Sequence, residues 1–205
     1  MDYISGVKVV EDLSIVELQD VERVGMVVKV RGAIHSIRDM GEVAFVVIRR
    51  RDGLVQTVYQ EGSGEVGIKE LREGGTVEVL GTVKVEDRAP NGVEILLKSV
   101  RVLSEPAEGL PLSISKWKMN ASLETMLDRR AIALRNVRER AKFKVQEGVV
   151  RAFREFLHGQ GFTEIHTPKI GAKSAEGGAN LFKLEYFHKP AVLQQSPQFY
   201  KQMMV

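Results

Sequence analysis

The hydrophobic pattern of this chain changes once, at Glu105–Pro111, and that change limits what the chain can fold into. Before this point, short runs rich in β-branched and aromatic residues alternate with turn-forming residues, which is typical of strands. After it, apolar residues recur every four positions, which is typical of an amphipathic helix. The segment itself holds two prolines and a glycine and fits neither pattern. We therefore expect two domains, residues 1–105 and 128–205, joined by a hinge at 106–127.

The first domain carries five strand signals. They lie at Val27–Ile37, Glu42–Ile48, Leu54–Tyr59, Thr76–Val85 and Gly92–Leu103. Gly32 inside the first segment indicates a bulge or a close approach of two backbones. A polar stretch at Glu61–Gly75 leaves room for one or two helical turns between the third and fourth strands. This order predicts a five-stranded Greek-key barrel, the OB-fold, although other small barrels have similar strand counts.

Composition excludes several classes of protein. Hydrophobic residues make up 43% of the chain, which is enough for a packed core. There is no cysteine, so disulfides and thiolate metal sites are excluded. The four histidines, His35, His158, His166 and His188, have no partners at metal-ligand spacing, so we predict no metal site.

Targeting signals are also missing from the printed sequence. No apolar run approaches the roughly 20 residues that a transmembrane helix needs. The first residues, Met1-Asp-Tyr-Ile-Ser5, lack the basic and apolar segments of a signal peptide. We therefore expect a cytoplasmic protein with no membrane contact.

Charge is distributed unevenly between the two halves. Residues 1–105 hold 14 Lys and Arg against 18 Asp and Glu, whereas residues 106–205 hold 16 against 9. A basic half suits a polyanionic partner such as a nucleic acid, because binding releases counterions. A solvated charged surface explains the same excess equally well. Any nucleic-acid contact in the first half must therefore rely on a few local groups.

A long helix is predicted after the hinge. One apolar stripe runs along it: Val137, Ala141, Val145, Val149, Phe153 and Leu157, with Phe156 beside it. Gly159 and Gly161 are expected to end the helix in left-handed conformations. An apolar stripe of this length needs a cover.

Three motifs follow the helix. They are Gly161-Phe-Thr-Glu-Ile-His-Thr-Pro168, Ala175-Glu-Gly-Gly-Ala-Asn-Leu-Phe182 and Gln195-Ser-Pro-Gln-Phe-Tyr-Lys-Gln202. Together they resemble the amino-acid-binding half of class II aspartyl-tRNA synthetases of the archaeal type, and the chain resembles the N-terminal portion of that family. The resemblance implies an incomplete antiparallel sheet with helices in residues 128–205. The first motif, with a short strand at Phe162–Pro168, resembles motif 1, which implies a homodimer interface at Phe162 and Pro168.

The third motif also has a local reading. Ser196 and Pro197 are suited to the N-cap and first position of a helix. Gln198 and Lys201 are then three residues apart on one helix face. The resemblance implies that Gln198 binds the substrate, Lys201 pairs with its side-chain carboxylate, and Ser196 supports the pocket, while Glu176 engages the α-ammonium. A cationic donor selects aspartate over asparagine, although a solvated helix lysine is the alternative for Lys201.

The barrel resembles the anticodon-binding domain of the same family. The resemblance rests on Arg31–Gly41, Ala44–Arg49 and Asp52–Gln56. It implies that Phe45 stacks on an anticodon base, that Gln56 reads base edges, and that Arg38 and Glu94 contribute. Strand parity leaves open whether Phe45 faces the core or solvent. Ala33 departs from the family, whose members usually have tryptophan there.

His35 bears on which tRNA is accepted. Some relatives have tryptophan at this position and are restricted to the aspartate anticodon, whereas others with histidine also tolerate the asparagine anticodon. The resemblance therefore implies that tRNA(Asn) is a partner besides tRNA(Asp). A strand histidine of no consequence is the alternative.

The resemblance implies an ATP-dependent aspartate–tRNA ligase that uses Mg²⁺. The family's Phe-Arg-x-Glu motif 2 and Gly-rich motif 3, whose arginines hold ATP, do not occur after Gln202. We therefore expect the chain as given to bind ATP poorly and to be inactive alone. The alternative is a stand-alone RNA-binding OB-fold protein with a vestigial synthetase segment.

Overall fold

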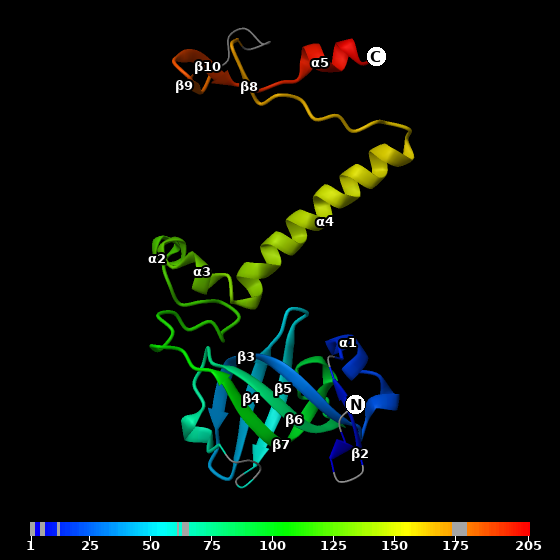
Figure 1. Ribbon diagram of the computed structural model, residues 1–205, viewed down its shortest axis with the longest axis vertical. Helices are drawn as coiled ribbons and strands as arrows, with labels where there is room; N and C mark the ends of the chain where they lie inside the picture. The colour runs from blue at the N-terminus through cyan, green and yellow to red at the C-terminus, as the bar shows by residue number, and fades with distance from the viewer. Residues whose placement is uncertain (1–2, 5–6, 12, 61, 63–65, 174–179) are drawn as a thin grey trace. The chain divides into compact units, whose positions relative to one another are not determined.

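The computed structural model describes the chain except residues 1–2, 5–6, 12, 61, 63–65 and 174–179. It falls into two compact units, Met1–Lys144 and Val145–Val205. Figure 1 shows the strands of the first unit, the long helix α4 (Val137–Gly159) that continues from the first unit into the second, and the small sheet of the second.

The first unit is built around a closed barrel. Its strands are β3 (Val27–Asp39), β4 (Val43–Arg49), β5 (Leu54–Gln60), β6 (Thr76–Val85) and β7 (Val93–Ser104). Antiparallel pairing joins β3 to β4, β4 to β5 and β6 to β7, while β5 and β7 pair in parallel. A further antiparallel ladder between β3 and β6 closes the ring. The single turn η2 (Ile68–Glu70) lies between β5 and β6, so the predicted five-stranded OB-fold is confirmed.

The core of the barrel comes from every second strand residue. On β4, Ala44, Val46 and Ile48 are buried while their neighbours are half-exposed. The predicted close approach at Gly32 is confirmed, because a Cβ there would lie 2.5 Å from Ile48 Cγ2 and 2.7 Å from the Arg49 carbonyl oxygen. Thr57, the fully buried polar residue of β5, donates its hydroxyl to the Val46 carbonyl at 2.8 Å.

Elements before the barrel were not foreseen from the sequence. Short strands β1 (Tyr3–Ile4) and β2 (Val7–Glu11) extend the sheet, with β2 parallel to β3. The helical turn α1 (Ile15–Leu18) begins with a capping box between Ser14 and Glu17. That hydrogen bond to Ser14 lowers the pKa of Glu17. The turns η1 (Val21–Arg23) and η3 (Pro90–Gly92) complete the unit.

Residues after β7 form a second, smaller core. Leu112, Ile114, Met119 and Ala133 are buried together, and the short helices α2 (Leu123–Asp128) and α3 (Arg130–Ala133) lie beside α4 in the chain. Buried Asn136 ties these parts together. Its amide donates to the Ile114 and Lys116 carbonyls at 2.9 and 2.7 Å, and its oxygen accepts from the first N–H groups of α4. Asn136 thereby caps α4, which no sequence motif had indicated.

The second unit contains most of α4 and a three-stranded antiparallel sheet. The sheet has the order β8 (Ile170–Gly171), β10 (Lys189–Leu193), β9 (Lys183–Tyr186). The two-residue turn between β9 and β10 has positive φ at both residues, as its right-handed twist requires. A last helix, α5, covers Gln198–Met203.

Three local predictions in this unit were wrong. No strand forms at Phe162–Pro168, because within the described chain no neighbouring strand pairs with it; the first strand there is β8. Gly161 has the expected positive φ, but Gly159 is simply the last residue of α4. Helix α5 begins one residue later than predicted, with Pro197 at the N-cap and no capping hydrogen bond from Ser196.

Candidate functional site

One face of the barrel brings together most of the residues that the sequence singled out. On β4 the alternating pattern turns Phe45, Val47 and Arg49 away from the core. This answers the question that strand parity left open, since Phe45 is half-exposed on the outer face. The ladder with β3 places Arg38 directly across from Phe45, and Arg38 is exposed.

Gln56 and Glu94 form the polar end of this outer face. They are paired in the β5–β7 ladder, and the Gln56 amide donates to a Glu94 carboxylate oxygen at 3.1 Å. Lys84 approaches the other carboxylate oxygen at 3.2 Å. The hydrogen bond to Glu94 raises the pKa of Lys84. Sequence reasoning missed Lys84, because only the β6–β7 register reveals that it lies opposite Glu94.

This arrangement suits a single-stranded base. An aromatic ring on a strand surface offers a stacking platform, and a guanidinium across from it can neutralise a nearby phosphate. The fixed Gln56 side chain still offers its amide oxygen and second N–H to a base edge. Glu94 is buried, and both of its carboxylate oxygens are engaged by Gln56 and Lys84. Its main effect is therefore to position these two side chains, and it has little surface left for a ligand.

His35 is not part of the outer face. Its side chain is 3% exposed, and it lies in a bulge of β3 between Ile34 and Ser36. Its Nδ1 has no hydrogen-bond partner among the described residues. Burial, and after it the charge of Arg49, lowers the pKa of His35. Any effect of His35 on a bound base therefore passes through the shape of β3.

The predicted aspartate-binding residues lie in the second unit. Gln198 and Lys201 are exposed on α5, three residues apart, and Ser196 is half-exposed just before it. The segment is fastened at its start, where the Gln194 and Gln195 amides donate to the carbonyls of Lys173 and Asn180 at 2.8 and 2.7 Å. Glu176 lies outside the described residues.

The predicted dimer surface is apolar and exposed. Along α4, Val145, Val149, Phe153 and Phe156 each have about two thirds of their surface exposed, and so does Phe162 after it. Pro168 is exposed as well. An apolar hollow of about 450 Å³ is lined by Phe162 together with Val149, Phe153 and Leu157 of the helix. The predicted stripe is thus present, and within its own unit nothing described covers it.

The described residues contain neither a cluster of metal ligands nor a membrane-spanning helix. No group of three His, Asp or Glu side chains is placed to hold a metal ion. None of the helices in the described part of the chain has the length and apolar character needed to cross a membrane.

Two family models match successive parts of the chain, and the boundary between them precedes the division of the structure at Lys144 and Val145. Residues 28–103 match the family model of the OB-fold nucleic acid binding domain. Residues 122–205 match that of the tRNA synthetases class II (D, K and N).

The curated relatives and the solved structures that match this chain are aminoacyl-tRNA synthetases. The chain is 49% identical over 181 residues to the Aspartate–tRNA(Asp/Asn) ligase of Deinococcus radiodurans, covering 88% of this chain and 40% of the relative. It is 40% identical over 188 residues to the ligase of the same name from Archaeoglobus fulgidus, covering 90% and 44%. The structure matches asparaginyl-tRNA synthetase from Pyrococcus horikoshii complexed with asparaginyl-adenylate, with TM-score 0.75, 34% identity and coverage of 89% and 42%. The chain thus spans about two fifths of the length of its relatives.

Proposed function

Because the chain belongs to the class II aminoacyl-tRNA synthetases and carries their OB-fold and synthetase domains, we propose that it acts in the ATP-dependent attachment of aspartate to tRNA(Asp). The barrel reads the anticodon, and residues 128–205 supply part of the aspartate site. The observation that carries this proposal is the outer face of the barrel, where Phe45, Arg38 and Gln56 lie together on neighbouring strands.

The barrel contributes binding energy and selection. An anticodon base stacks on Phe45, which contributes on the order of 1–3 kcal/mol. Gln56 hydrogen-bonds a base edge, and its amide is held in one orientation by Glu94 at 3.1 Å. A fixed amide rejects a base with the wrong donor and acceptor pattern, because a mismatched polar group is left unpaired. Arg38 neutralises a backbone phosphate.

The second unit contributes recognition of aspartate. Lys201 pairs its ammonium with the side-chain carboxylate, Gln198 hydrogen-bonds the substrate, Ser196 supports the pocket, and Glu176 takes the α-ammonium. Lys201 is free to do so, since no carboxylate of the described residues is within ion-pair distance of it. Asparagine offers no charge to this lysine and is therefore rejected.

Catalysis belongs to the complete protein. There the α-carboxylate of aspartate attacks the α-phosphate of ATP and pyrophosphate leaves; a hydroxyl at the 3′-end of the tRNA then attacks the carbonyl of the adenylate, and AMP leaves. Mg²⁺ neutralises the phosphates. The residues of this chain bind and orient aspartate and tRNA, and we assign none of them to ATP or to the metal. We place the protein in the cytoplasm.

We extend the proposal to tRNA(Asn) as a second substrate. Support comes from the names of the relatives at 49% and 40% identity, which state both tRNAs, and from His35 in place of tryptophan. Buried His35 occupies less space inside the β3 bulge than an indole would, so the strand beneath the anticodon is shaped differently. Aspartylation of both transcripts by the complete protein tests this. A preference of a hundredfold or more for tRNA(Asp), on the order of 3 kcal/mol, would show that the enzyme discriminates.

A second copy of the chain is the proposed cover for α4. The stripe of Val145, Val149, Phe153 and Phe156 is exposed, and the hollow beside Phe162 can receive apolar side chains from another surface. Isologous packing of two such helices buries both stripes at once.

The test of the function is aspartate-dependent pyrophosphate exchange by the complete protein. Lys201→Met should reduce exchange by a factor on the order of a thousand or more, because it removes the group that pairs with the substrate charge. Lys189→Met is the matched control, as Lys189 is an exposed lysine of β10 in the same unit, and its exchange should equal that of the parent. Exchange within a few-fold of the parent in Lys201→Met would refute the role of Lys201. Absence of exchange in the parent, with RNA binding retained, would favour the stand-alone RNA-binding protein.

A further inference from the structure

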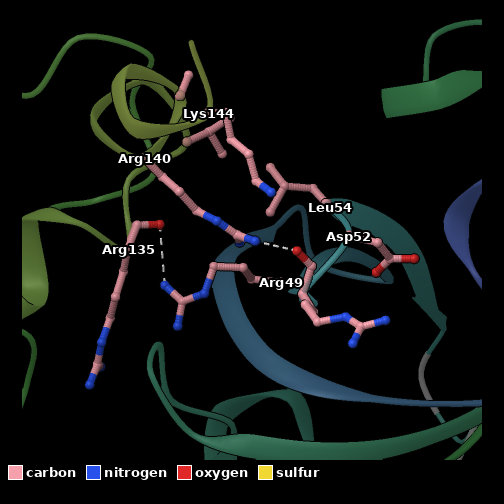
Figure 2. Close-up of a pocket in the computed structure, with 10 residues that line it drawn as sticks. Arg49, Asp52, Leu54, Arg135, Arg140 and Lys144 are labelled. Atoms are coloured by element: carbon pink, nitrogen blue, oxygen red, sulfur yellow. Dashed lines mark hydrogen bonds between the residues drawn. The ribbon is translucent and has the colours of Figure 1, made fainter. Parts of the chain in front are cut away.

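A second pocket lies at the end of the barrel that holds the β4–β5 turn. It has a volume of about 380 Å³ and opens between the β4–β5 turn and the first turns of α4, all within the first unit. In Figure 2 the side chains of Arg49 and Arg140 enter the pocket from its barrel side and its helix side, and Lys144 extends from the same helix as Arg140. We refer to this site as the arginine pocket.

The arginine pocket concentrates positive charge. Its walls carry Arg49, Arg51, Arg135, Arg140 and Lys144. Among the described residues no carboxylate forms an ion pair with Arg49, Arg135 or Arg140. All three are half-buried, and burial lowers the pKa of Arg49, with the charges of Arg135 and Arg140 lowering it further. Half-buried cations that repel one another are costly unless an anion joins them.

Carbonyl groups hold the arginines in place without neutralising them. Arg49 donates to the Arg135 carbonyl at 3.3 Å, and Arg140 donates to the Arg51 carbonyl. Each guanidinium has five N–H donors, so most of its donors remain available. Two guanidinium groups that line one pocket, each fixed by a carbonyl, offer the forked N–H donors that bind phosphate.

The one carboxylate in the wall is already engaged elsewhere. Asp52 accepts from the Ile15 backbone N–H at 2.7 Å and pairs with Arg50 at 3.6 Å. In Figure 2 its carboxylate points away from Arg140. Asp52 therefore does not supply the missing negative charge.

The arginine pocket is continuous with the face that we propose for the anticodon. Arg49 and Phe45 are both turned outward on β4, and four strand residues span about 13 Å. A few nucleotides that begin at Phe45 can reach Arg49. Resting on the proposed function, we propose that the arginine pocket is a phosphate-binding site, occupied by a backbone phosphate of the tRNA bound on the outer face.

The experiment measures binding of a stem-loop RNA with the aspartate anticodon, and of the same stem-loop with an unrelated anticodon, to the 205-residue chain at several salt concentrations. Removing both guanidinium groups, as R49Q/R140Q, should weaken binding of both RNAs by the same factor, about tenfold. The slope of log Kd against log salt should fall by about 1, the signature of one lost phosphate contact. The preference between the two RNAs should not change, because a phosphate carries no sequence information.

Two further variants serve as controls. K98Q/R101Q removes two positive charges from β7 in the same unit and should leave affinity and slope unchanged. R49K/R140K keeps both charges but lacks the forked N–H donors of the guanidinium groups. It should therefore have the salt slope of the parent and only part of its RNA affinity. Circular dichroism checks folding; if R49Q/R140Q is unfolded, R140Q alone is measured with the same expectation at smaller amplitude.

Several outcomes would overturn the proposal. One is an R49Q/R140Q variant that binds RNA with the affinity and salt slope of the parent. Another is an equal loss of RNA affinity in K98Q/R101Q, which would indicate that the general positive charge of the unit attracts the RNA. Titration with inorganic phosphate in the absence of RNA separates the two sources of the ligand. If the parent binds phosphate saturably, R49Q/R140Q abolishes that binding and RNA binding is unaffected, the ligand of the pocket is free phosphate and not the tRNA backbone. Equal binding of both RNAs by the parent, with the slope still lower in R49Q/R140Q, would instead contradict the anticodon assignment and leave the phosphate site standing.

Discussion

The two units of this chain differ in how they treat their apolar side chains. The barrel closes five strands around a core in which Val28, Ile34 and Ile48 have almost no exposed surface. In Val145–Val205 the buried hydrophobic residues among those described are Ala191 and Val192, while Phe153, Phe156 and Phe182 are each about two thirds exposed.

This difference bears on what each unit can do by itself. The barrel's outer face rests on a core made by its own strands, so its geometry needs no other protein. The second unit leaves a surface that another surface must cover, and its substrate residues lie on the short helix α5. We therefore infer that the proposed anticodon binding needs the first unit alone, whereas the proposed aspartate binding needs the complete protein and the proposed dimer.

The largest effect is expected on association. Val149→Glu with Phe153→Glu places two charges in the exposed stripe of α4 and should weaken dimerisation by about 4 kcal/mol or more, because an uncompensated charge buried in an interface costs about 3–5 kcal/mol. Arg151→Glu, on the polar side of the same helix, is the control and should dimerise like the parent. Light scattering over a range of concentrations gives the dissociation constant. A parent chain that stays monomeric at high concentration would contradict the dimer.

The next largest effect is the difference in stability lost when a buried and an exposed apolar residue are each replaced by alanine. Ile48→Ala should lower the free energy of unfolding by about 2–5 kcal/mol, because it opens a cavity in the barrel core. Phe182→Ala removes a larger side chain, yet it should change stability by only about 0.5 kcal/mol, because that side chain is already exposed. Urea unfolding measures both. Equal losses would show that the second unit has a core of its own.

A smaller loss is expected at Gly32. An alanine there would place its Cβ 2.5 Å from Ile48 Cγ2 and 2.7 Å from the Arg49 carbonyl oxygen. Such overpacking costs about 1–3 kcal/mol. Gly148→Ala, on α4 where nothing lies within 4 Å of the added Cβ, should be neutral or stabilising. A Gly32→Ala chain as stable as the parent in urea would show that β3 and β4 can separate without cost.

The smallest effect is a pH dependence at His35. Burial lowers its pKa in the folded barrel, below the value of about 6.5 that it has when unfolded. The unfolded chain therefore takes up the proton first as pH falls, and folding loses stability below about pH 6.5. The stability of the parent relative to His35→Gln should be greatest near neutral pH and should decrease toward pH 5. Urea unfolding at several pH values checks this; a difference independent of pH would mean that His35 is not destabilised when charged.

Much of the barrel could be predicted because its information is local. Runs of β-branched residues separated by Arg-Asp-Gly and Pro-Asn-Gly turns indicate strands whichever partner each strand later pairs with. All five strands lie near their predicted bounds. The partners across strands are not local. The approach of Lys84 to Glu94 depends on the β6–β7 register, and the arginine pocket joins Arg49 to Arg140, which are far apart in sequence.

The predictions that were wrong lie in the second unit, because they too depended on contacts that are not local in the sequence. The segment Phe162–Pro168 has a sequence suited to a strand, but a strand needs a hydrogen-bonded neighbour, and none of the described residues supplies one. Likewise Ser196 has the chemistry of an N-cap, yet α5 begins after Pro197. The roles of Glu176, Ser196, Gln198 and Lys201 remain predictions from the family resemblance.

The central claim is that the first unit alone reads the anticodon, and the direct measurement is RNA binding by the isolated Met1–Lys144 unit. It should bind the stem-loop with the aspartate anticodon more tightly than one with an unrelated anticodon. Phe45→Ala should weaken the cognate complex by about 1–3 kcal/mol, whereas Leu103→Ala, at an exposed apolar position of β7, should not. Equal affinity for the two stem-loops, or a Phe45→Ala unit that binds as well as its parent, would contradict the account.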